Sequence, residues 1–473
     1  MREFKMTIEA EAPPDAAPRE IKSPYDGRCV GTVDFGGPQA VEAAIEAARR
    51  AAPKMATLST HARVKILQGM AHALARRQDE TAQIIADEAG KPIQYARAEA
   101  ARCVDTFLEA AEQCKRLGGE YISIDAVPAG DGRYGVVRRF PLGSVAAISP
   151  FNFPLNLSAH KLAPAIAAGN SVVLKPASQT PMSSCVLAEA AAEAGLPAGA
   201  LSVVPASREA ANQLTVDERL ALLTFTGSAE VGWAMKGRAG KKKVVLELGG
   251  NAAALVGPDA DLQTTVPRLV IGAFAYAGQV CISVQRIFVH EPLAAAFIER
   301  FVETTQTLAR TGDPDLPDVV VGPMIDRANA ERIVAWIEEA RGAGAQVLCG
   351  GETRDSCVTP AVLTGADPSL KIVAEEAFGP VVVIEPVKDW DEAIARTNDS
   401  RFGLQCGVFT NDLKAAWRCF EQIEVGGVIH NDFPTFRVDH MPYGGVKDSG
   451  CGREGPRYAI EEMSEPRLLV LNP

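Results

Sequence analysis

The sequence predicts an α/β protein in which two doubly wound parallel sheets are accompanied by a small β arm. Three observations lead to this prediction. The chain has 473 residues, which is too many for one ordinary hydrophobic core. Short apolar strands alternate with helical segments from residue 171 to 248, and a second alternating series runs from 252 to about 428. Repetition of strand and helix builds a parallel sheet that helices cover on both faces.

The N-terminal part is expected to be mostly helical. Residues 9–19 are small, polar and interrupted by prolines, so we expect a loosely held arm there, with structure beginning near Ile21. From residue 39 to about 117, apolar side chains recur at the spacing of one helix face, for example Val41 and Ala44. We interpret these segments as ordinary core helices.

Two short segments predict the β arm. Strand-like runs flank the turn residues Pro128–Arg133 between about 118 and 140, which is the pattern of a β-hairpin. The apolar run Pro466–Asn472 near the C-terminus also predicts a strand. Because an exposed strand can extend the sheet of a second subunit, we expect a homodimer or a homotetramer.

The first alternating series predicts its elements in order. Strands are expected at 171–175, 201–204, 220–225 and 244–248, and helices at 183–194, 207–214 and 229–238. The stretch Leu222–Ser228 ends a strand and opens a helix that contains Gly232, a geometry in which backbone N–H groups attract phosphate. It lacks the GxGxxG fingerprint, and Trp233 and Ala234 replace the residues that a nucleoside triphosphatase loop needs. A dinucleotide remains compatible with this segment.

Composition and charge argue against several classes of partner. Hydrophobic residues make up 47% and charged residues 23%, as in ordinary globular proteins. The net charge of -11 argues against nucleic acid, because phosphate binding needs a cationic surface. The first residues lack the apolar core of a signal peptide, and no run reaches the roughly 18 apolar residues that span a bilayer. We expect a cytoplasmic protein with no nucleic-acid or membrane partner.

The 10 cysteines lie scattered along the chain. No CxxC pair occurs, and the cysteines form no metal-ligand cluster with the 6 histidines, so we expect reduced thiols and no metal site. Cys281 is the candidate for special chemistry. The upstream Glu247 offers it a carboxylate partner that could later recruit water.

Six separate segments together resemble the aldehyde dehydrogenase superfamily. They are Pro150–Pro154, Leu174–Pro176, Phe225–Ser228, Leu246–Gly250, Gly278–Cys281 and Glu375–Pro380. Their order and spacing agree with that family, and the resemblance covers nearly the whole chain. It implies a dinucleotide-binding domain at 1–117 and 140–248, a catalytic domain at 249–450, and a bridging arm at 118–139 and 451–473.

The resemblance also implies a mechanism. In this family a thiolate adds to an aldehyde carbon, hydride passes to a nicotinamide, and water releases the acid from the thioester. Cys281 matches the nucleophile and Glu247 matches the general base. The amide of Asn152, with the backbone N–H of Cys281, matches the site that receives the oxyanion. The alternatives are a buried apolar cysteine, a surface carboxylate that ends a strand, and an asparagine that caps a turn.

The same resemblance assigns residues to a bound NAD or NADP. The expected cofactor-binding residues are Pro150, Phe151, Lys175, Ser178, Gly227, Ser228, Leu248, Gly249, Glu376 and Phe378. Lys175 and Glu376 match residues that hold ribose hydroxyls, and Phe378 matches a residue on the nicotinamide side. Gly249 and Gly250 would leave room for the ring, since a Cβ would crowd it. Lys175 could otherwise be a surface charge at a strand end.

The choice between the two cofactors depends on Ser178. NAD-selective relatives commonly carry a carboxylate three residues after this lysine, where it binds the 2′-hydroxyl of the adenosine ribose. A serine does not repel a 2′-phosphate, and Lys175 or Arg208 could attract one. We therefore expect NADP to be accepted.

The substrate is expected to be a short aldehyde. The segments Gly278–Ser283 and Phe436–Gly445 are most similar to the lactaldehyde dehydrogenase-like branch, near enzymes for short oxidised or phosphonate-bearing aldehydes. The channel is expected near Phe151, His160, Val280, Ile282 and the loop 433–439. His160 is either a polar contact to the substrate or an ordinary buried histidine.

Two arginines are candidates for holding an anionic substrate tail. Arg437 could make a bidentate contact, and Arg102 lies on a helix that borders the channel in relatives. The alternative is that each arginine pairs with a nearby carboxylate, Arg437 with Asp439 and Arg102 with Asp105. Val280 replaces the arginine that phosphonate-oxidising relatives tend to carry, which disfavours a phosphonate.

Two other functions stay in competition. An acylating dehydrogenase would pass the acyl group to coenzyme A instead of water, but such relatives often lack the general-base carboxylate that Glu247 provides. A catalytically silent homologue would keep the fold for cofactor binding or a structural role. The presence of Cys281, Asn152 and Glu247 together weighs against that function.

Overall fold

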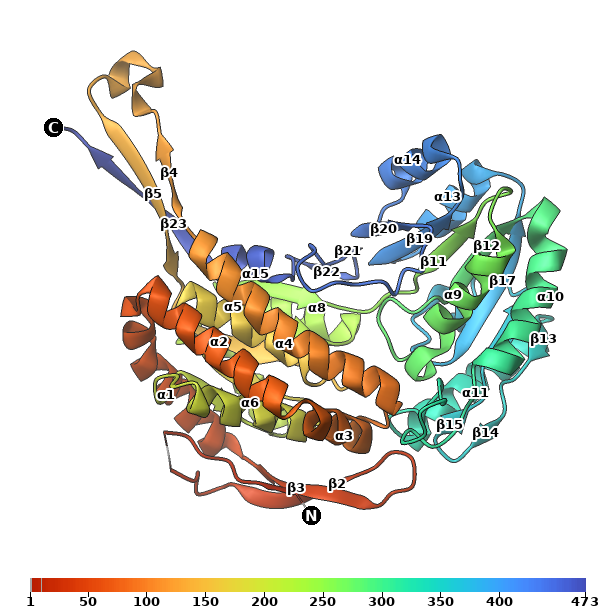
Figure 1. The fold of residues 1–473 in the computed structure, drawn as a ribbon, viewed down its shortest axis with the longest axis horizontal. Coiled ribbons are helices and arrows are strands. Elements are labelled where there is room, and N and C mark those ends of the chain that lie inside the picture. Colours follow the sequence, from red (N-terminus) through yellow and green to blue (C-terminus); the bar gives the residue numbers. More distant parts are fainter. Residues whose placement is uncertain (1, 10) are drawn as a thin grey trace.

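The computed structural model describes residues 2–9 and 11–473, and two sheet-centred lobes with a projecting β arm make up the chain (Figure 1). The two large sheets are mostly parallel and the arm is antiparallel, so the predicted fold class is confirmed. No helix within this described part of the chain combines the length and apolarity needed to cross a membrane.

The first lobe is built on a six-stranded sheet. In spatial order its strands are β22 (Gly450–Cys451), β10 (Lys243–Glu247), β9 (Leu222–Thr226), β6 (Ser144–Ile148), β7 (Ser171–Lys175) and β8 (Leu201–Val203). All neighbours pair in parallel except β22, which runs antiparallel to β10. Every residue of β6 and β9 is buried, as expected of short Val, Ala and Leu-rich strands in a sheet with two covered faces.

Helices cover both faces of this sheet because alternate residues of each strand point in opposite directions. Val145 and Val172 pack in the cluster that holds α2 (Thr60–Arg76), α4 (Ile93–Arg116), α5 (Asn156–Ala168) and α6 (Met182–Glu193). Ala146 and Val173 pack in the opposite cluster, with α1 (Pro38–Thr57), α7 (Arg208–Val216) and α8 (Ala229–Arg238). Helix α3 (Gln78–Ala89) joins the first group.

The strand order contains a switch point that places the site. From β6 the chain adds β7 and then β8 on one side, and it returns to add β9 and β10 on the other. Parallel strands that diverge in this way leave a crevice beyond their carboxyl ends. Ile148, Thr226 and Glu247 are the last residues of the three strands at this crevice.

The second lobe is built on a seven-stranded sheet. In spatial order its strands are β13 (Gln346–Cys349), β16 (Ala361–Thr364), β17 (Val381–Val387), β12 (Arg286–His290), β11 (Ala253–Val256), β19 (Gln405–Phe409) and β20 (Gly427–His430). The covering helices are α9 (Leu262–Phe274), α10 (Glu291–Leu308) and α11 (Arg327–Gly342) on one face, and α13 (Trp390–Asn398) and α14 (Leu413–Gln422) on the other. The remaining elements are β14 (Thr353–Arg354), β15 (Cys357–Val358), β18 (Phe402–Gly403), β21 (Val446–Lys447), α12 (Lys371–Ala374), α15 (Pro456–Glu462) and the short helices η1 (Ile124–Ala126), η2 (Pro128–Gly130) and η3 (Ala275–Gly278).

The arm is a three-stranded antiparallel sheet that projects from the first lobe (Figure 1). The predicted hairpin is confirmed, since β4 (Gly119–Ile122) pairs with β5 (Tyr134–Pro141). The predicted C-terminal strand is β23 (Ser464–Leu471), and it pairs with β5 of its own chain. Its other edge carries no partner strand within the described chain, so this edge stays exposed for pairing.

The structure begins earlier than expected. Instead of starting near Ile21, the chain forms β1 (Arg2–Phe4), which pairs in parallel with β3 (Cys29–Phe35), while β2 (Ala17–Lys22) pairs with β3 on its other side. Met6 and Ile8 are buried in the core cluster of α1. The prediction was wrong because apolar side chains that are isolated in the sequence find their partners on a distant helix.

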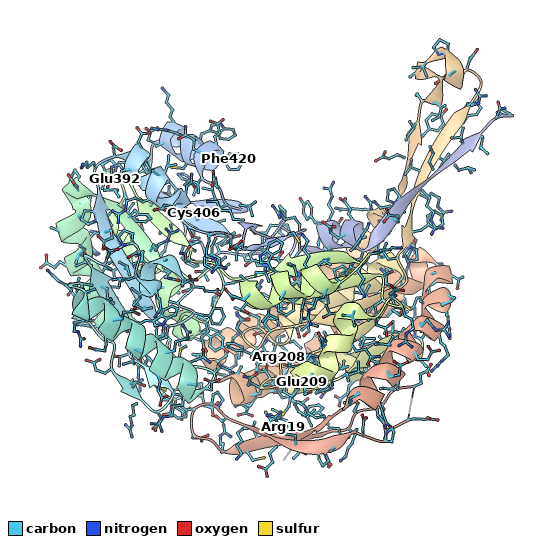
Figure 2. The ribbon with its side chains drawn as sticks, turned by 180° about the vertical axis from the view of Figure 1, so that it is seen from behind. Arg19, Arg208, Glu209, Glu392, Cys406 and Phe420 are labelled. Carbon is cyan, nitrogen blue, oxygen red and sulfur yellow. The ribbon has the colours of Figure 1, made fainter. Side chains whose placement is uncertain are left out.

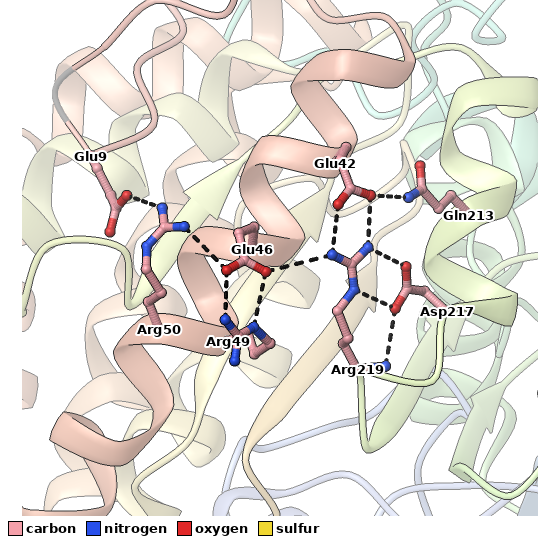
Figure 3. A network of polar contacts seen from close by, with 8 residues as sticks. All are labelled: Glu9, Glu42, Glu46, Arg49, Arg50, Gln213, Asp217 and Arg219. Atoms are coloured by element: carbon pink, nitrogen blue, oxygen red, sulfur yellow. Dashed lines mark hydrogen bonds and ion pairs between the residues drawn. The ribbon is translucent and has the colours of Figure 1, made fainter.

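A surface network of charged groups holds α1 beside its neighbours (Figure 3). Arg219 links Glu42 on α1 to Asp217, at N···O distances of 2.6 Å to each. Arg50 bonds both Glu9 and Glu46, which connects the N-terminal segment to the same helix. Exposed ion pairs stabilise a fold only weakly one by one, so their contribution comes from forming a network.

Candidate active site

A tightly held loop between η3 and β12 presents Cys281. Tyr276, Ala277 and Gly278 just before it have φ values of 54°, 55° and 64°, three successive left-handed residues. Two of them carry a Cβ, for which this conformation is unfavourable, so contacts elsewhere must maintain it. The Tyr276 hydroxyl donates to the Ala89 carbonyl at 3.1 Å, and a Cβ at Gly278 would collide with the Gly379 carbonyl.

Gln279 fixes the same loop through hydrogen bonds of its side chain and its backbone. Its side-chain amide donates to the Pro323 carbonyl at 3.1 Å and accepts from the Ile325 N–H at 2.8 Å. Its backbone carbonyl accepts from Asn152 Nδ2 at 2.9 Å. Asn152 follows β6, so this bond ties the cysteine loop to the switch point of the first sheet. The amide of Asn152 keeps a second N–H for another acceptor.

Cys281 lies where two cavities meet. It lines a larger one of about 690 Å³ and a smaller one of about 50 Å³. Its sulfur lies 2.9 Å from the hydroxyl of Tyr443. Burial raises the pKa of the Cys281 thiol to about 12, and the hydrogen bond with Tyr443 opposes this rise. A ligand in either cavity would lie next to Cys281.

Glu247 ends β10 and lines the smaller cavity with Cys281. It is only 2% exposed, so it is not a surface carboxylate. Neither carboxylate oxygen has a hydrogen-bond partner among the described residues. Burial and the nearby Glu454 raise the pKa of Glu247 well above its ordinary value. Such a group holds a proton more readily than an ordinary carboxyl and can exchange it with a molecule that enters the cavity.

The larger cavity opens beyond the carboxyl ends of the first sheet. Eight of the ten expected cofactor residues line it, namely Pro150, Phe151, Gly227, Ser228, Leu248, Gly249, Glu376 and Phe378. Lys175 and Ser178 do not line it, although Ala177 between them does. Its volume is in the range of cofactor sites, and its place at a topological switch point is the usual one for a dinucleotide.

The N-terminus of α8 forms part of this cavity wall. Ser228 is the N-cap residue, and its side chain makes no capping hydrogen bond. Ser228, Ala229 and Glu230 all line the cavity, so the first N–H groups of the helix are close to its space. Gly232 allows the helix to lie against Leu248, because a Cβ at this glycine would collide with the leucine side chain. These features fit a bound pyrophosphate.

Glu376 packs directly against the two glycines that follow Leu248. The Gly250 N–H donates to the Glu376 carboxylate at 3.1 Å, and burial raises the pKa of Glu376 to about 7. A Cβ at Gly249 would collide with this carboxylate, and a Cβ at Gly250 would lie 2.7 Å from the Cys281 carbonyl oxygen. The absence of a Cβ at these two glycines makes room for Glu376 and for the cysteine loop.

The proposed 2′-phosphate region lies beside the larger cavity. Ser178 Oγ makes a long contact of 3.4 Å to the Ala206 carbonyl. Burial and the neighbouring cation Arg208 lower the pKa of Lys175 to about 8. Arg208 and Glu209 are adjacent and exposed at the start of α7 (Figure 2). Two cations near each other would be stabilised by a phosphate bound between them.

The smaller cavity contains four of the five expected substrate residues. Arg102, Val280, Ile282 and Arg437 line it, whereas His160 does not. His160 lies in the layer behind, where its Nε2 is 2.8 Å from Asp439 Oδ1. Burial lowers the pKa of His160, so the ring is neutral at physiological pH.

The two arginines pair with carboxylates other than those we considered. Arg102 donates two hydrogen bonds to Asp439, at 3.1 and 2.8 Å, and Arg437 donates to Glu454 at 3.1 Å. Hydrogen bonds from His160 and Arg102 hold the pKa of Asp439 far below its ordinary value despite its burial. The pairs Arg102–Asp105 and Arg437–Asp439 are absent from the described residues.

The sequence patterns did not single out three residues of this site. Tyr443 contacts the sulfur, Glu454 pairs with Arg437, and Lys161 donates to Glu454 at 3.2 Å. Lys161 carried a usable signal, because it is a charged residue in α5, where all 13 residues are buried. Glu454 and Tyr443 carried none, since their partners lie far away in the sequence. No group that could hold a metal ion occurs within residues 2–9 and 11–473.

Comparison with protein families gives one match across nearly the whole chain. The model described as aldehyde dehydrogenase family matches residues 12–469. The chain is 42% identical over 473 residues to 3-sulfolactaldehyde dehydrogenase of Priestia aryabhattai, covering 100% of this chain and 98% of that protein. Lactaldehyde dehydrogenases are also among the relatives, as the sequence analysis predicts.

Two solved structures are similar along the full length. Aldehyde dehydrogenase 21 from Physcomitrella patens, in complex with the reaction product succinate, has a TM-score of 0.97 and 43% identity, covering 100% of this chain and 98% of that one. Glyceraldehyde-3-phosphate dehydrogenase from Methanocaldococcus jannaschii, complexed with NADP, has a TM-score of 0.91 and 37% identity, covering 96% of this chain and 99% of that one.

Proposed function

We propose, from the premise that this chain belongs to the aldehyde dehydrogenase family and is an NAD(P)-dependent enzyme, that it oxidises a short anionic aldehyde to the carboxylic acid through Cys281. The observation that carries this proposal is the position of Cys281 at the meeting of two cavities. The larger one has the volume of a dinucleotide site, and the smaller one brings Cys281, Glu247 and two arginines together around the position proposed for the aldehyde.

The chain's own residues account for each step. The Cys281 thiolate attacks the aldehyde carbon, and the amide of Asn152 with the Cys281 backbone N–H stabilises the oxyanion. Bound NAD(P) supplies the hydride acceptor. The thioester on Cys281 then reacts with water that gives a proton to the ionised form of Glu247. A buried base without hydrogen-bond partners is suited to this role, because nothing competes with the water for its oxygens.

The charges around the smaller cavity favour an anionic tail. Arg102, Lys161 and Arg437 are the cations that line it or pair with a lining group, and only Asp439 and Glu454 oppose them as ionised carboxylates. Burial and the nearby Glu454 raise the pKa of Glu247, which favours its neutral form. While Glu247 is protonated, one positive charge is unmatched in a low-dielectric region, where a substrate anion would neutralise it.

Arg437 is the proposed contact for that anion. Its side chain is 8% exposed, and its buried Nε–H has no acceptor among the described residues. A buried donor without an acceptor costs free energy, so a carboxylate or sulfonate from the substrate would recover it. The relatives named above, a 3-sulfolactaldehyde dehydrogenase and a dehydrogenase that holds succinate, support an anionic substrate.

We expect Arg437→Met to raise KM for 3-sulfolactaldehyde by about 10- to 100-fold, the loss of one charge-assisted contact. KM for lactaldehyde, which lacks the sulfonate, should change less than about threefold because it never used the contact. The KM of Arg437→Lys for 3-sulfolactaldehyde should fall between these values, since lysine keeps the positive charge but cannot donate two parallel hydrogen bonds as a guanidinium does. Steady-state kinetics with both aldehydes, and with succinate semialdehyde against butanal, measure this. Equal changes for charged and neutral aldehydes would contradict the anion proposal.

Cofactor selectivity gives a second test. The native enzyme is expected to accept NADP, and Ser178→Asp should lower kcat/KM for NADP by about 10-fold relative to NAD, because a carboxylate repels the 2′-phosphate. The matched control is Gln179→Glu, the same type of charge change at the exposed next position. A strong preference of the native enzyme for NAD, or equal effects of the two substitutions, would oppose the role of Ser178.

We propose that the enzyme works as a homodimer or homotetramer. Two apolar surfaces lack partners within the described chain, one on β23 with Leu468 and Leu469 at 55% and 56% exposure, and one on α14 with Trp417 and Phe420 at 63% and 59%. The arm and α14 rise on the same side of the molecule (Figure 2). Surfaces of this kind usually mark subunit contacts.

Light scattering at micromolar concentration should give two or four times the 50.1 kDa of one chain. The double substitution Trp417→Glu and Phe420→Glu should shift the mass toward that of one chain, because burying two carboxylates opposes association. A mass of one chain for the native protein would exclude the proposed assembly.

A further inference from the structure

We propose that Tyr443 is a further catalytic residue, whose hydroxyl donates a hydrogen bond that stabilises the thiolate form of Cys281 before the aldehyde binds. This inference rests on the proposed role of Cys281 as nucleophile. The inference is based on the distance of 2.9 Å between Tyr443 Oη and Cys281 Sγ, two residues that are 162 positions apart in the sequence.

The hydrogen bond joins two side chains that have no other hydrogen-bond partner among the described residues. Tyr443 is 3% exposed, and Cys281 is the only hydrogen-bond partner of its hydroxyl among the described residues. Burial raises the pKa of Tyr443 well above its ordinary value, so the phenol keeps its proton. When the sulfur is ionised, the phenol is the only member of the pair with a proton to donate.

The backbone around Tyr443 holds the hydroxyl at the sulfur. The Tyr443 N–H donates to the Glu454 carbonyl at 3.1 Å, and the Glu454 N–H donates to the Tyr443 carbonyl at 2.7 Å. The next residue is Gly444 with φ of 155°, and a Cβ there would lie 2.8 Å from a Glu247 oxygen. The segment therefore lies close to both Cys281 and Glu247 and has little freedom to move the ring.

Arg437 strengthens the donor. Its guanidinium carbon lies 3.7 Å from the centre of the Tyr443 ring, and its hydrogen bond to Glu454 keeps it there. A cation over the ring withdraws electron density from the phenol, which makes the O–H a better donor. Glu454, Arg437, Tyr443 and Cys281 thus form a continuous series of contacts that ends at the reacting atom.

The hydrogen bond favours ionisation of the Cys281 thiol, which burial disfavours. Burial of the sulfur makes the thiolate unfavourable, and the hydrogen bond from Tyr443 is the first of the contacts that oppose this effect. Hydrogen bonds to charged groups are the strong ones in proteins. Loss of this bond should therefore reduce the thiolate population by about 10- to 100-fold at neutral pH.

The test measures alkylation of Cys281 by iodoacetamide in the full-length enzyme, with peptide mass spectrometry to separate Cys281 from the other nine cysteines. Tyr443→Phe keeps the ring and its stacking but removes the donor, and it should slow alkylation at about pH 7 by at least about 10-fold. The matched control is Tyr95→Phe, because Tyr95 is partly buried on α4 and lines neither cavity. It should react like the native enzyme.

A second measurement keeps the hydroxyl in place. Replacing Tyr443 alone by 3-fluorotyrosine makes the phenol a stronger donor, so alkylation of Cys281 should become faster. An alkylation rate of folded Tyr443→Phe within about twofold of native, or no acceleration with 3-fluorotyrosine, would overturn the inference. Neither measurement uses aldehyde or dinucleotide, so a wrong substrate assignment cannot imitate this failure.

Discussion

Cys281→Ala is expected to lower kcat/KM for aldehyde oxidation by at least about 10⁴-fold, because no other group can form the covalent intermediate. Cys281 is the only cysteine that lines either cavity around the site. Removing it leaves no nucleophile at the point where the aldehyde and the dinucleotide would meet. The rate of NAD(P)H formation, followed by absorbance with a short anionic aldehyde, measures the loss.

A matched control separates this loss from damage to the fold. Cys419 on α14 is a buried free thiol that lines neither cavity, so Cys419→Ala should retain activity within about twofold. Cys281→Ala should still bind the dinucleotide with near-native affinity, as measured by quenching of protein fluorescence. Appreciable turnover by folded Cys281→Ala would mean that the covalent mechanism is wrong.

Glu247→Gln is expected to give the second largest loss, about 10²- to 10⁴-fold in steady-state kcat. The amide has the shape of the protonated carboxyl but cannot take a proton from water. Formation of the thioester does not need this base, so rapid mixing should still show a burst of about one NAD(P)H per active site. A loss of the burst together with the steady-state rate would show that Glu247 acts before hydrolysis.

The pH dependence of the native enzyme tests the same residue. Burial and Glu454 raise the pKa of Glu247, and a base works only after it has lost its proton. The kcat of the native enzyme should therefore rise with pH above the range in which an ordinary carboxyl titrates, and this rise should be absent in Glu247→Gln. Glu385→Gln is the matched control, because burial also raises the pKa of Glu385 in the second lobe, outside both cavities.

Glu247→Gln also distinguishes hydrolysis from acyl transfer to coenzyme A. If water is the natural acceptor, the native product is the free acid with or without coenzyme A, and the variant accumulates the thioester on Cys281. Intact-mass spectrometry of the stalled variant should show one acyl group per chain. Acyl-coenzyme A as the main product of the native enzyme would favour the acylating dehydrogenase instead.

Local sequence patterns were sufficient for the parts of this fold that depend on neighbours in the chain. The strand expected at 171–175 is β7 with the same bounds, and the hairpin around Pro128–Arg133 forms as expected. Cys281 and Glu247, singled out by their flanking residues, line the same cavity. These features were accessible because strand periodicity and turn chemistry act within a few residues.

Contacts between residues that are distant in the sequence could be identified only from the folded structure. Asp439 pairs with Arg102 across 337 residues, which leaves His160 in the layer behind the cavity, and Tyr443 reaches Cys281 across 162 residues. No periodicity encodes such pairs, since each follows from how strands and loops of separate segments pack together. For the same reason only the tertiary structure shows that Glu247 is buried without a partner, and its altered protonation is a property of the packed environment.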